Sequence, residues 1–320
     1  MMTPKENFYA MINNEQPEYA PCFVLDFNMS VLLTNNADQP WQGGIDPFGV
    51  NWSLTHEGPL PEPGKFMFTE ISDWEKYVKF PDVDSLGLEQ MAAIELQGFD
   101  PNKPTNLASV CGIFERMAAF MGFENTLMAL AEDPEECRRF AEAFADYKIA
   151  TIERGIDLIH PDMVILFDDI ATAQTLFMSP ETWREVFKPA YKRIVDAVHA
   201  KGVIYSQHTC GKCEDIIDDY VDIGVRWWNS AQSQNDLVKI MKKYPDKLVV
   251  EGGWNSQGPA SYVGASPEDI EEETKRCLRE YACFNNFSFM PLVLTATGNA
   301  FERSQELSLA LETWAKGCRH

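Results

Sequence analysis

Short apolar runs alternate with longer amphipathic segments along most of this chain. Apolar runs of about four to eight residues are typical of strands buried on both faces, and apolar spacing near 3.6 residues is typical of helices. The runs that predict strands begin at residues 22, 107, 163, 203, 225, 247 and 286. Helical segments separate these runs after residue 100, so the pattern predicts a parallel sheet covered by helices.

The number of predicted strands favours a closed barrel. With an eighth strand in residues 28–80 or near 293–297, the chain has the elements of a (β/α)8 TIM barrel. No Gly-x-Gly-x-x-Gly segment follows any predicted strand, which argues against an open dinucleotide-binding sheet. We therefore expect a single α/β domain that spans residues 1–320.

Residues 28–80 do not follow the alternation. They are rich in Asn, Asp, Gly and Pro, and they contain Trp41, Trp52 and Trp74. Within them, residues 46–52 predict the edge of a small hairpin. An irregular excursion of this length in a compact domain is usually functional or a lid, although its aromatic residues equally fit packing within the excursion.

Composition narrows the classes of partner. The 49 acidic and 27 basic residues give a net charge of −22, which argues against nucleic acid and against anionic membrane surfaces as partners. The amino terminus lacks the apolar run of a signal peptide, and no apolar stretch is long enough to span a membrane. We expect a cytoplasmic protein whose eight cysteines are reduced.

Candidate catalytic side chains lie where predicted strands end. Asp26 ends the first run, Cys111 the second and Asp168 the third, and Glu251 lies near the end of the run from residue 247. In α/β barrels the carboxyl ends of the strands face the active site. Asp26, Asp168 and Glu251 are therefore predicted catalytic residues, although anchoring of a loop also explains Asp26 and helix capping also explains Asp168.

A His-x-Cys-Gly-x-Cys cluster follows the predicted strand at residue 203. His208 and Cys210 are two residues apart, so their side chains point to the same side of an extended chain. Imidazole and thiolate are ligands that zinc prefers. Cys213 is a candidate third ligand, and it equally fits a thiol at the first turn of a helix. A core histidine beside a reduced cysteine is the alternative interpretation of the cluster.

Aromatic residues accompany the candidate site. Phe167, Trp228 and Trp254 lie in or beside predicted strands, where they would shape an apolar pocket or pack on a methylated ammonium group. With Cys111 they are the predicted substrate-binding residues. Ordinary core packing is the alternative for each aromatic side chain.

Several short motifs follow one another along the chain: Gly122-Phe123-Glu124-Asn125, Asp133-Pro134-Glu135, Phe167-Asp168-Asp169, Ser179-Pro180-Glu181, Phe187-Lys188-Pro189, His208-Thr209-Cys210-Gly211 and Gly252-Gly253. In combination they resemble the uroporphyrinogen decarboxylase superfamily, a group of TIM barrels. The resemblance covers most of the chain. It implies one of two chemistries, because the superfamily contains both tetrapyrrole decarboxylases and corrinoid-dependent methyltransferases.

The arginine positions distinguish these two branches. The decarboxylases carry an arginine-rich amino-terminal motif that binds substrate carboxylates, whereas residues 19–28 contain no arginine and the first arginine of this chain is Arg116. Methyltransferases that act on coenzyme M hold zinc with His-x-Cys and a distant second cysteine. His208 and Cys210 match the first two ligands, but residues 291–298, where the second cysteine would lie, contain none.

The resemblance thus implies a methyltransferase, similar to O-demethylases of anaerobic metabolism, that moves a methyl group between a small methoxylated or methylamine-type compound and a corrinoid protein. Zinc would be held by His208 and Cys210, with Cys213 as the third ligand and Cys111 and Glu251 as alternatives to it. Asp168 and Glu251 would position or protonate the leaving group. No Asp-x-His-x-x-Gly segment occurs in the chain, so a partner protein would supply the corrinoid; a homodimer is also expected. A metal-free decarboxylase and a non-catalytic binding barrel are the alternatives.

Overall fold

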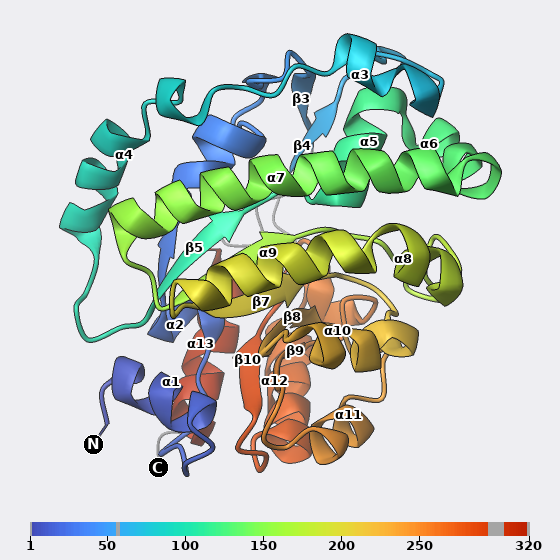
Figure 1. Ribbon diagram of the computed structural model, residues 1–320. Coiled ribbons are helices and arrows are strands. Elements are labelled where there is room, and N and C mark those ends of the chain that lie inside the picture. Colours follow the sequence, from blue (N-terminus) through green and yellow to red (C-terminus); the bar gives the residue numbers. More distant parts are fainter. Residues whose placement is uncertain (1, 56–57, 294–303, 319–320) are drawn as a thin grey trace.

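The computed structural model describes residues 2–55, 58–293 and 304–318. Its main feature is a curled parallel sheet of seven strands in a TIM-barrel-like fold (Figure 1), as the sequence predicted. In order across the sheet, the strands are β1 (Asn28–Ser30), β5 (Thr105–Ser109), β6 (Met163–Phe167), β7 (Ile204–His208), β8 (Trp227–Ala231), β9 (Val249–Gly253) and β10 (Phe287–Met290). The eighth strand expected near 293–297 falls largely on residues 294–297, which lie outside the described residues.

Helices connect successive strands and cover the outer face of the sheet (Figure 1). The helices are α1 (Pro4–Ile12), α2 (Phe23–Asp26), α3 (Trp74–Tyr77), α4 (Leu88–Glu95), α5 (Ile113–Met121), α6 (Phe123–Glu132), α7 (Pro134–Ile159), α8 (Pro180–Val186), α9 (Lys188–Ala200), α10 (Ile217–Ile223), α11 (Leu237–Lys243), α12 (Pro267–Tyr281) and α13 (Gln305–Cys318). None of those described is both long and apolar enough to cross a membrane.

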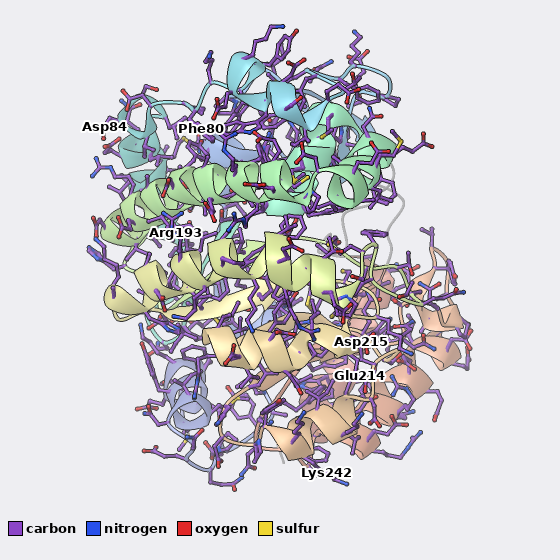
Figure 2. The ribbon with its side chains drawn as sticks, turned by 45° about the vertical axis from the view of Figure 1, so that its right-hand side comes forward. Phe80, Asp84, Arg193, Glu214, Asp215 and Lys242 are labelled. Carbon is purple, nitrogen blue, oxygen red and sulfur yellow. The ribbon has the colours of Figure 1, made fainter. Side chains whose placement is uncertain are left out.

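Helix starts follow the local sequence signals. Asp133, Ser179 and Ser266 each cap a helix that has proline in its first turn, and each side chain accepts a hydrogen bond from the third following backbone amide. Between neighbouring helices, Arg193 of α9 donates to the backbone oxygen of Glu142 and pairs with Asp146, both on α7 (Figure 2). Caps and ion pairs of this kind fix the ends and the spacing of the outer layer.

The first predicted strand is not a strand. Residues 21–27 were expected to form one, but the chain makes a single bridge from Cys22 to Phe289 of β10 and then turns into α2. The Asp26 carboxylate accepts the backbone N–H of Cys22 at 2.8 Å, so a local side-chain bond replaces the sheet bond that an extended chain would make. The first strand is instead β1, which pairs with β5.

The strands separate two apolar regions. Inside the barrel, Met163 and Ile165 of β6 pack with Trp227 of β8, and Phe8 and Met11 of α1 close the end nearest the amino termini of the strands. The larger core lies between the sheet and the outer helices. Because both faces of the strands are buried, β6 is apolar along its whole length.

The excursion forms a small antiparallel sheet of β2 (Gly44–Ile45), β3 (Asn51–Thr55) and β4 (Gly58–Pro61). Residues 46–52, where the edge of a hairpin was predicted, form the turn between β2 and β3 and the first two residues of β3. In Figure 1 this sheet lies beyond α7, on the side away from the strands of the barrel.

Four fully buried charges join the excursion to the barrel: Asp38, Asp46, Arg116 and Lys148. Lys148 of α7 lies 2.6 Å from Asp38 and donates to the backbone oxygen of Val110 at 2.7 Å. Arg116 of α5 lies 2.5 Å from Asp46 and donates to the backbone oxygen of Asp38 at 2.6 Å. Each charge keeps a partner of opposite sign, which is the condition for burying it.

Replacing Lys148 with Met is expected to lower the free energy of unfolding by about 3–5 kcal/mol, because it leaves Asp38 buried without its cation. Urea denaturation measures the change. The control is Lys192→Met, which removes an exposed pair with Asp196 on one helix face and should cost about 0.5 kcal/mol or less. Equal losses in the two variants would contradict the importance of the buried pair.

Candidate metal-binding site at the rim of the barrel

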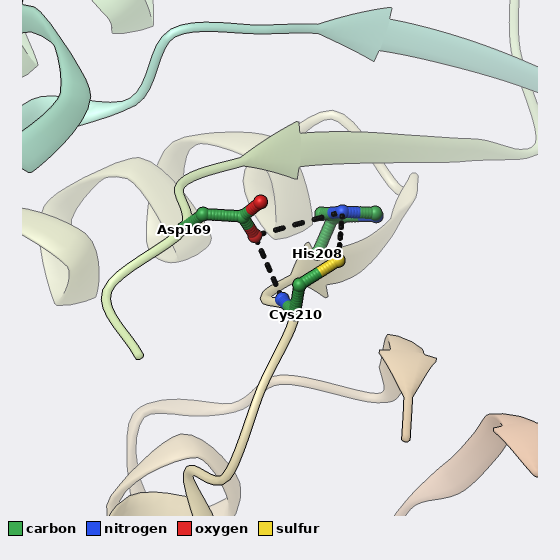
Figure 3. Close-up of side chains that lie close together, drawn as sticks. All are labelled: Asp169, His208 and Cys210. Atoms are coloured by element: carbon green, nitrogen blue, oxygen red, sulfur yellow. Dashed lines mark hydrogen bonds and ion pairs between the residues drawn. The ribbon is translucent and has the colours of Figure 1, made fainter. Parts of the chain in front are cut away.

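Asp169, His208 and Cys210 converge at the carboxyl end of the sheet (Figure 3). Their ligand atoms all lie within 4.8 Å of one another. The Nε2 atom of His208 is 3.4 Å from the Cys210 sulfur and 3.7 Å from Oδ1 of Asp169. The same Asp169 oxygen accepts the backbone N–H of Cys210 at 2.7 Å. His208 and Cys210 therefore meet as their spacing predicted, and Asp169 joins them.

The spacing of this group fits one tetrahedral metal ion. Ligands at about 2.0–2.3 Å from a zinc ion lie roughly 3.3–3.7 Å from one another along the edges of the tetrahedron. The two measured separations, 3.4 and 3.7 Å, match those edges. One nitrogen, one sulfur and one carboxylate oxygen are also a donor set that zinc accepts. Asp169 is 42% exposed, which leaves one side of the group open.

The register of the sheet aligns one inward-facing side chain of each strand from β6 to β10, and we call this set the register row. Phe167, His208, Asn229, Glu251 and Ser288 are register partners on the consecutive strands β6 to β10. The Phe167 ring stacks on the His208 ring at 4.1 Å between centroids. Nδ1 of His208 is hydrogen-bonded to Oδ1 of Asn229. The Asn229 amide and the Ser288 hydroxyl each donate to a Glu251 oxygen at 2.6 Å.

Burial sets the protonation of this region. It lowers the pKa of His208, whereas the nearby Asp169 opposes that shift, so the imidazole is neutral and able to bind a metal near pH 7. Burial, with Asp169 adding to it, holds the pKa of the Cys210 thiol well above its usual range. A bound cation would offset the effect on Cys210, because it stabilises the thiolate, and it would also keep the imidazole of His208 unprotonated.

A family model described as uroporphyrinogen decarboxylase (URO-D) matches residues 48–289 of the chain. The chain belongs to the URO-D family. The match includes the group of Asp169, His208 and Cys210 and all five positions of the register row. The resemblance expected from the short motifs is thereby confirmed.

Solved structures support the fold. A methyltransferase from Methanosarcina mazei is similar over 98% of this chain and 100% of its own, with 15% identity and a TM-score of 0.62. A sugar phosphate isomerase/epimerase from Parabacteroides distasonis covers 76% of this chain and 81% of its own at 10% identity, and its TM-score of 0.31 is too low to support an argument. A search of curated proteins found no match.

Asp168 of this URO-D family member faces away from the candidate metal-binding group. Its carboxylate accepts the backbone N–H groups of Phe114 at 3.0 Å and Glu115 at 2.9 Å, and the hydroxyl of Tyr191. It therefore caps the start of α5. Gly112 permits this approach, since a Cβ there would lie 2.4 Å from the Asp168 side chain. Helix capping, the alternative that the sequence left open, describes this contact.

The other predicted site residues lie apart from the group. Asp26 is buried and binds the backbone of Cys22. Cys111 ends its strand at a positive φ of 55° with its thiol buried. Cys213 is buried, lies outside the group of Asp169, His208 and Cys210, and donates its backbone N–H to Asn235. The structure thus places Asp169 where the sequence suggested Cys213.

The predicted aromatic residues divide between the two faces of the sheet. Phe167 faces inward and stacks on His208. Trp228 and Trp254 belong to the outer core, and the Trp254 indole donates to Ser261 at 2.7 Å. Sequence analysis did not select Asp169, Asn229 or Ser288. The adjacent Asp-Asp pair was the available signal for Asp169, whereas nothing in the sequence distinguished Asn229 or Ser288.

Glu251 is fully buried, and burial raises its pKa from 4.5 to about 7. Because the folded-state pKa is the higher one, its contribution to stability is present below pH 4.5 and is lost as the pH rises through 7. Between pH 4.5 and 8 the loss amounts to about 3 kcal/mol. In the Glu251→Gln variant the side chain at this position does not titrate, so its free energy of unfolding should not show this part of the decline with pH.

Urea denaturation of both proteins with a chelator present measures this difference at pH 5 and pH 8. We expect the free energy of unfolding of the parent protein to fall relative to the variant over that interval. Parallel pH dependence in the two proteins would show that the buried carboxyl group does not titrate there.

Proposed function

We propose that this protein transfers a methyl group between a small methylated compound and a corrinoid carried by a partner protein, with zinc held by Asp169, His208 and Cys210. The observation that carries the proposal is the convergence of these three donors, all within 4.8 Å of one another, at the rim of a URO-D family barrel. The overall fold is also similar to that of a methyltransferase from Methanosarcina mazei. Zinc bound there would supply Lewis acidity toward the leaving heteroatom.

The residues around the group suit this role. His208 is neutral, and its ring is held between Phe167 on one face and the hydrogen bond to Asn229 at its edge. Asp169 orients Cys210 through the backbone N–H of that residue. The open side at Asp169 gives a partner protein access to the rim. Phe167 excludes water from the inner side of the imidazole.

Methyl transfer needs no reactant other than the methyl donor, the corrinoid and a proton from solvent. The bond between the methyl carbon and its oxygen or nitrogen breaks, and the heteroatom keeps the electron pair. A Co(I) corrinoid carried by the partner protein would supply the electron pair of the new bond to the methyl carbon. The released alkoxide takes a proton from solvent at the exposed Asp169 side, whereas an amine released from a quaternary ammonium donor leaves neutral.

Charge around the site favours a neutral or cationic methyl donor. Glu115 lies near Asp169, and burial together with the charges of Asp169 and Asp168 holds the pKa of Glu115 well above its usual range. Among the described ion pairs, none joins Asp169 or Glu115 to a lysine or arginine. Apart from the proposed zinc ion, an anionic donor would meet like charge here and no lysine or arginine. Methoxylated and methylammonium compounds avoid that cost.

The family name raises decarboxylation as the second candidate function. A substrate with several carboxylates needs fixed cationic donors. The first arginine, Arg116, is fully buried and paired with Asp46, so it does not serve that purpose. Carbon dioxide release that is insensitive to chelators would favour this function over methyl transfer.

The purified protein is expected to contain about one zinc ion per chain, and Cys210→Ser should remove most of it. The matched control is Cys213→Ser, a nearby buried thiol outside the group, which should keep the metal. Metal analysis after gel filtration measures both variants. Zinc lost from the Cys213 variant but kept by the Cys210 variant would exclude the proposed donor set.

Activity is measured with cob(I)alamin as the corrinoid and a panel of methanol, a quaternary methylammonium salt and a methoxylated aromatic compound. We expect a donor of this panel to convert the Co(I) spectrum to that of methylcobalamin. The rate should fall by at least about 100-fold in His208→Ala, because a metal ligand is lost. Equal rates in the parent protein and this variant would overturn the role of the group.

A further inference from the structure

The register row connects the candidate metal ligand to a buried carboxylate that does not touch it. His208 bonds Asn229, and Asn229 bonds Glu251, which lies two strands away. All three residues are more than nine-tenths buried. Water therefore does not replace the hydrogen bonds among these side chains. Each hydrogen bond restricts the orientation of the next side chain.

The direction of the Asn229 amide follows from Glu251. Both carboxylate oxygens act as acceptors: one from the Ser288 hydroxyl and the other from the Asn229 amide, each at 2.6 Å. The NH2 group of Asn229 must therefore face Glu251, where the Met290 sulfur also accepts from it at 3.1 Å. The amide oxygen is then left to face the His208 ring.

The amide oxygen in turn determines which ring nitrogen carries the proton. An acceptor beside Nδ1 requires a hydrogen on Nδ1 in a neutral imidazole. The lone pair then lies on Nε2, the atom 3.4 Å from the Cys210 sulfur and 3.7 Å from Asp169. The opposite tautomer would point an N–H bond into the centre of the group.

We propose that Glu251, acting through Asn229, is a positioning residue that holds His208 in the Nδ1–H tautomer and makes Nε2 the donor atom of the rim group. In this role Glu251 acts on the metal-binding group through the side chain of Asn229 and does not contact the substrate. This inference deepens the proposed function, since it rests on the same site. Its first test needs neither metal nor substrate.

Nitrogen chemical shifts of 15N-labelled histidine report the tautomer in the metal-free protein. At pH 8.5 Glu251 is ionised, and the His208 signals are assigned by their absence in His208→Gln. We expect Nδ1 to carry the proton in the parent protein. A proton on Nε2 in the parent protein would overturn the proposal without any variant.

The Glu251→Ala variant tests the transmission. It frees the Asn229 amide to rotate, so the Nδ1–H form should no longer be the major tautomer. The matched control is Ser206→Ala, two residues before His208 on the inner face of β7, whose hydroxyl has no hydrogen-bond partner among the described residues. The control should keep the parent tautomer. An unchanged tautomer in Glu251→Ala would refute the proposed role.

Zinc affinity gives a second readout, by competition with a chromophoric chelator. Loss of the supporting bond should weaken binding by about 10–100-fold in Glu251→Ala, with no change in Ser206→Ala. Unchanged affinity would also count against the proposal. If the parent protein takes up no zinc, the proposed function fails, but the tautomer of the metal-free protein still decides the inference.

Discussion

The shared register of five neighbouring strands determines what this barrel presents at its rim. Parallel pairing from β6 to β10 places one residue of each strand at the same height, and the side chains at that height face inward. Because strand pairing fixes these positions, the polar groups in the row meet without long flexible side chains. The group of Asp169, His208 and Cys210 builds on this row.

Buried charged and polar side chains find their partners in two different ways in the molecule. The excursion is attached through full charges, Lys148 with Asp38 and Arg116 with Asp46, which are matched in sign. The inner row instead joins an imidazole, an amide, a carboxyl and a hydroxyl by hydrogen bonds. The first arrangement stabilises the attachment of a segment, whereas the second fixes the direction of donors and acceptors.

The sequence predicted the barrel because short buried strands alternate with helices, and the burial of both faces of those strands hid part of the site. His208 and Cys210 were predicted to share a side from their spacing alone. Asp168 and Asp169 follow the run Met163–Phe167, in which every residue is apolar, so no alternation indicated which aspartate faces inward. Choosing Asp169 requires knowing that Phe167 faces His208, and only the three-dimensional pairing supplies that information.

The segment before β1 was predicted wrongly for a different reason. Residues 21–27 have the composition of a strand, but Asp26 competes for the backbone N–H of Cys22, and this contact leaves no periodic signal. Asn229 and Ser288 were not selected because amide and hydroxyl side chains occur at many buried positions. Their importance arises from neighbours that are far away in the sequence.

The meeting of the amino-terminal segment with β10 has a consequence for how the molecule responds to change. There the Phe289 amide donates to the Pro21 carbonyl at 2.8 Å, and the Ser288 hydroxyl lies 3.4 Å from the same oxygen. That hydroxyl also holds Glu251. The contact between the amino-terminal segment and β10 is thus connected to the imidazole of His208 by successive hydrogen bonds. A displacement of the first twenty residues would therefore be transmitted to the rim of the barrel.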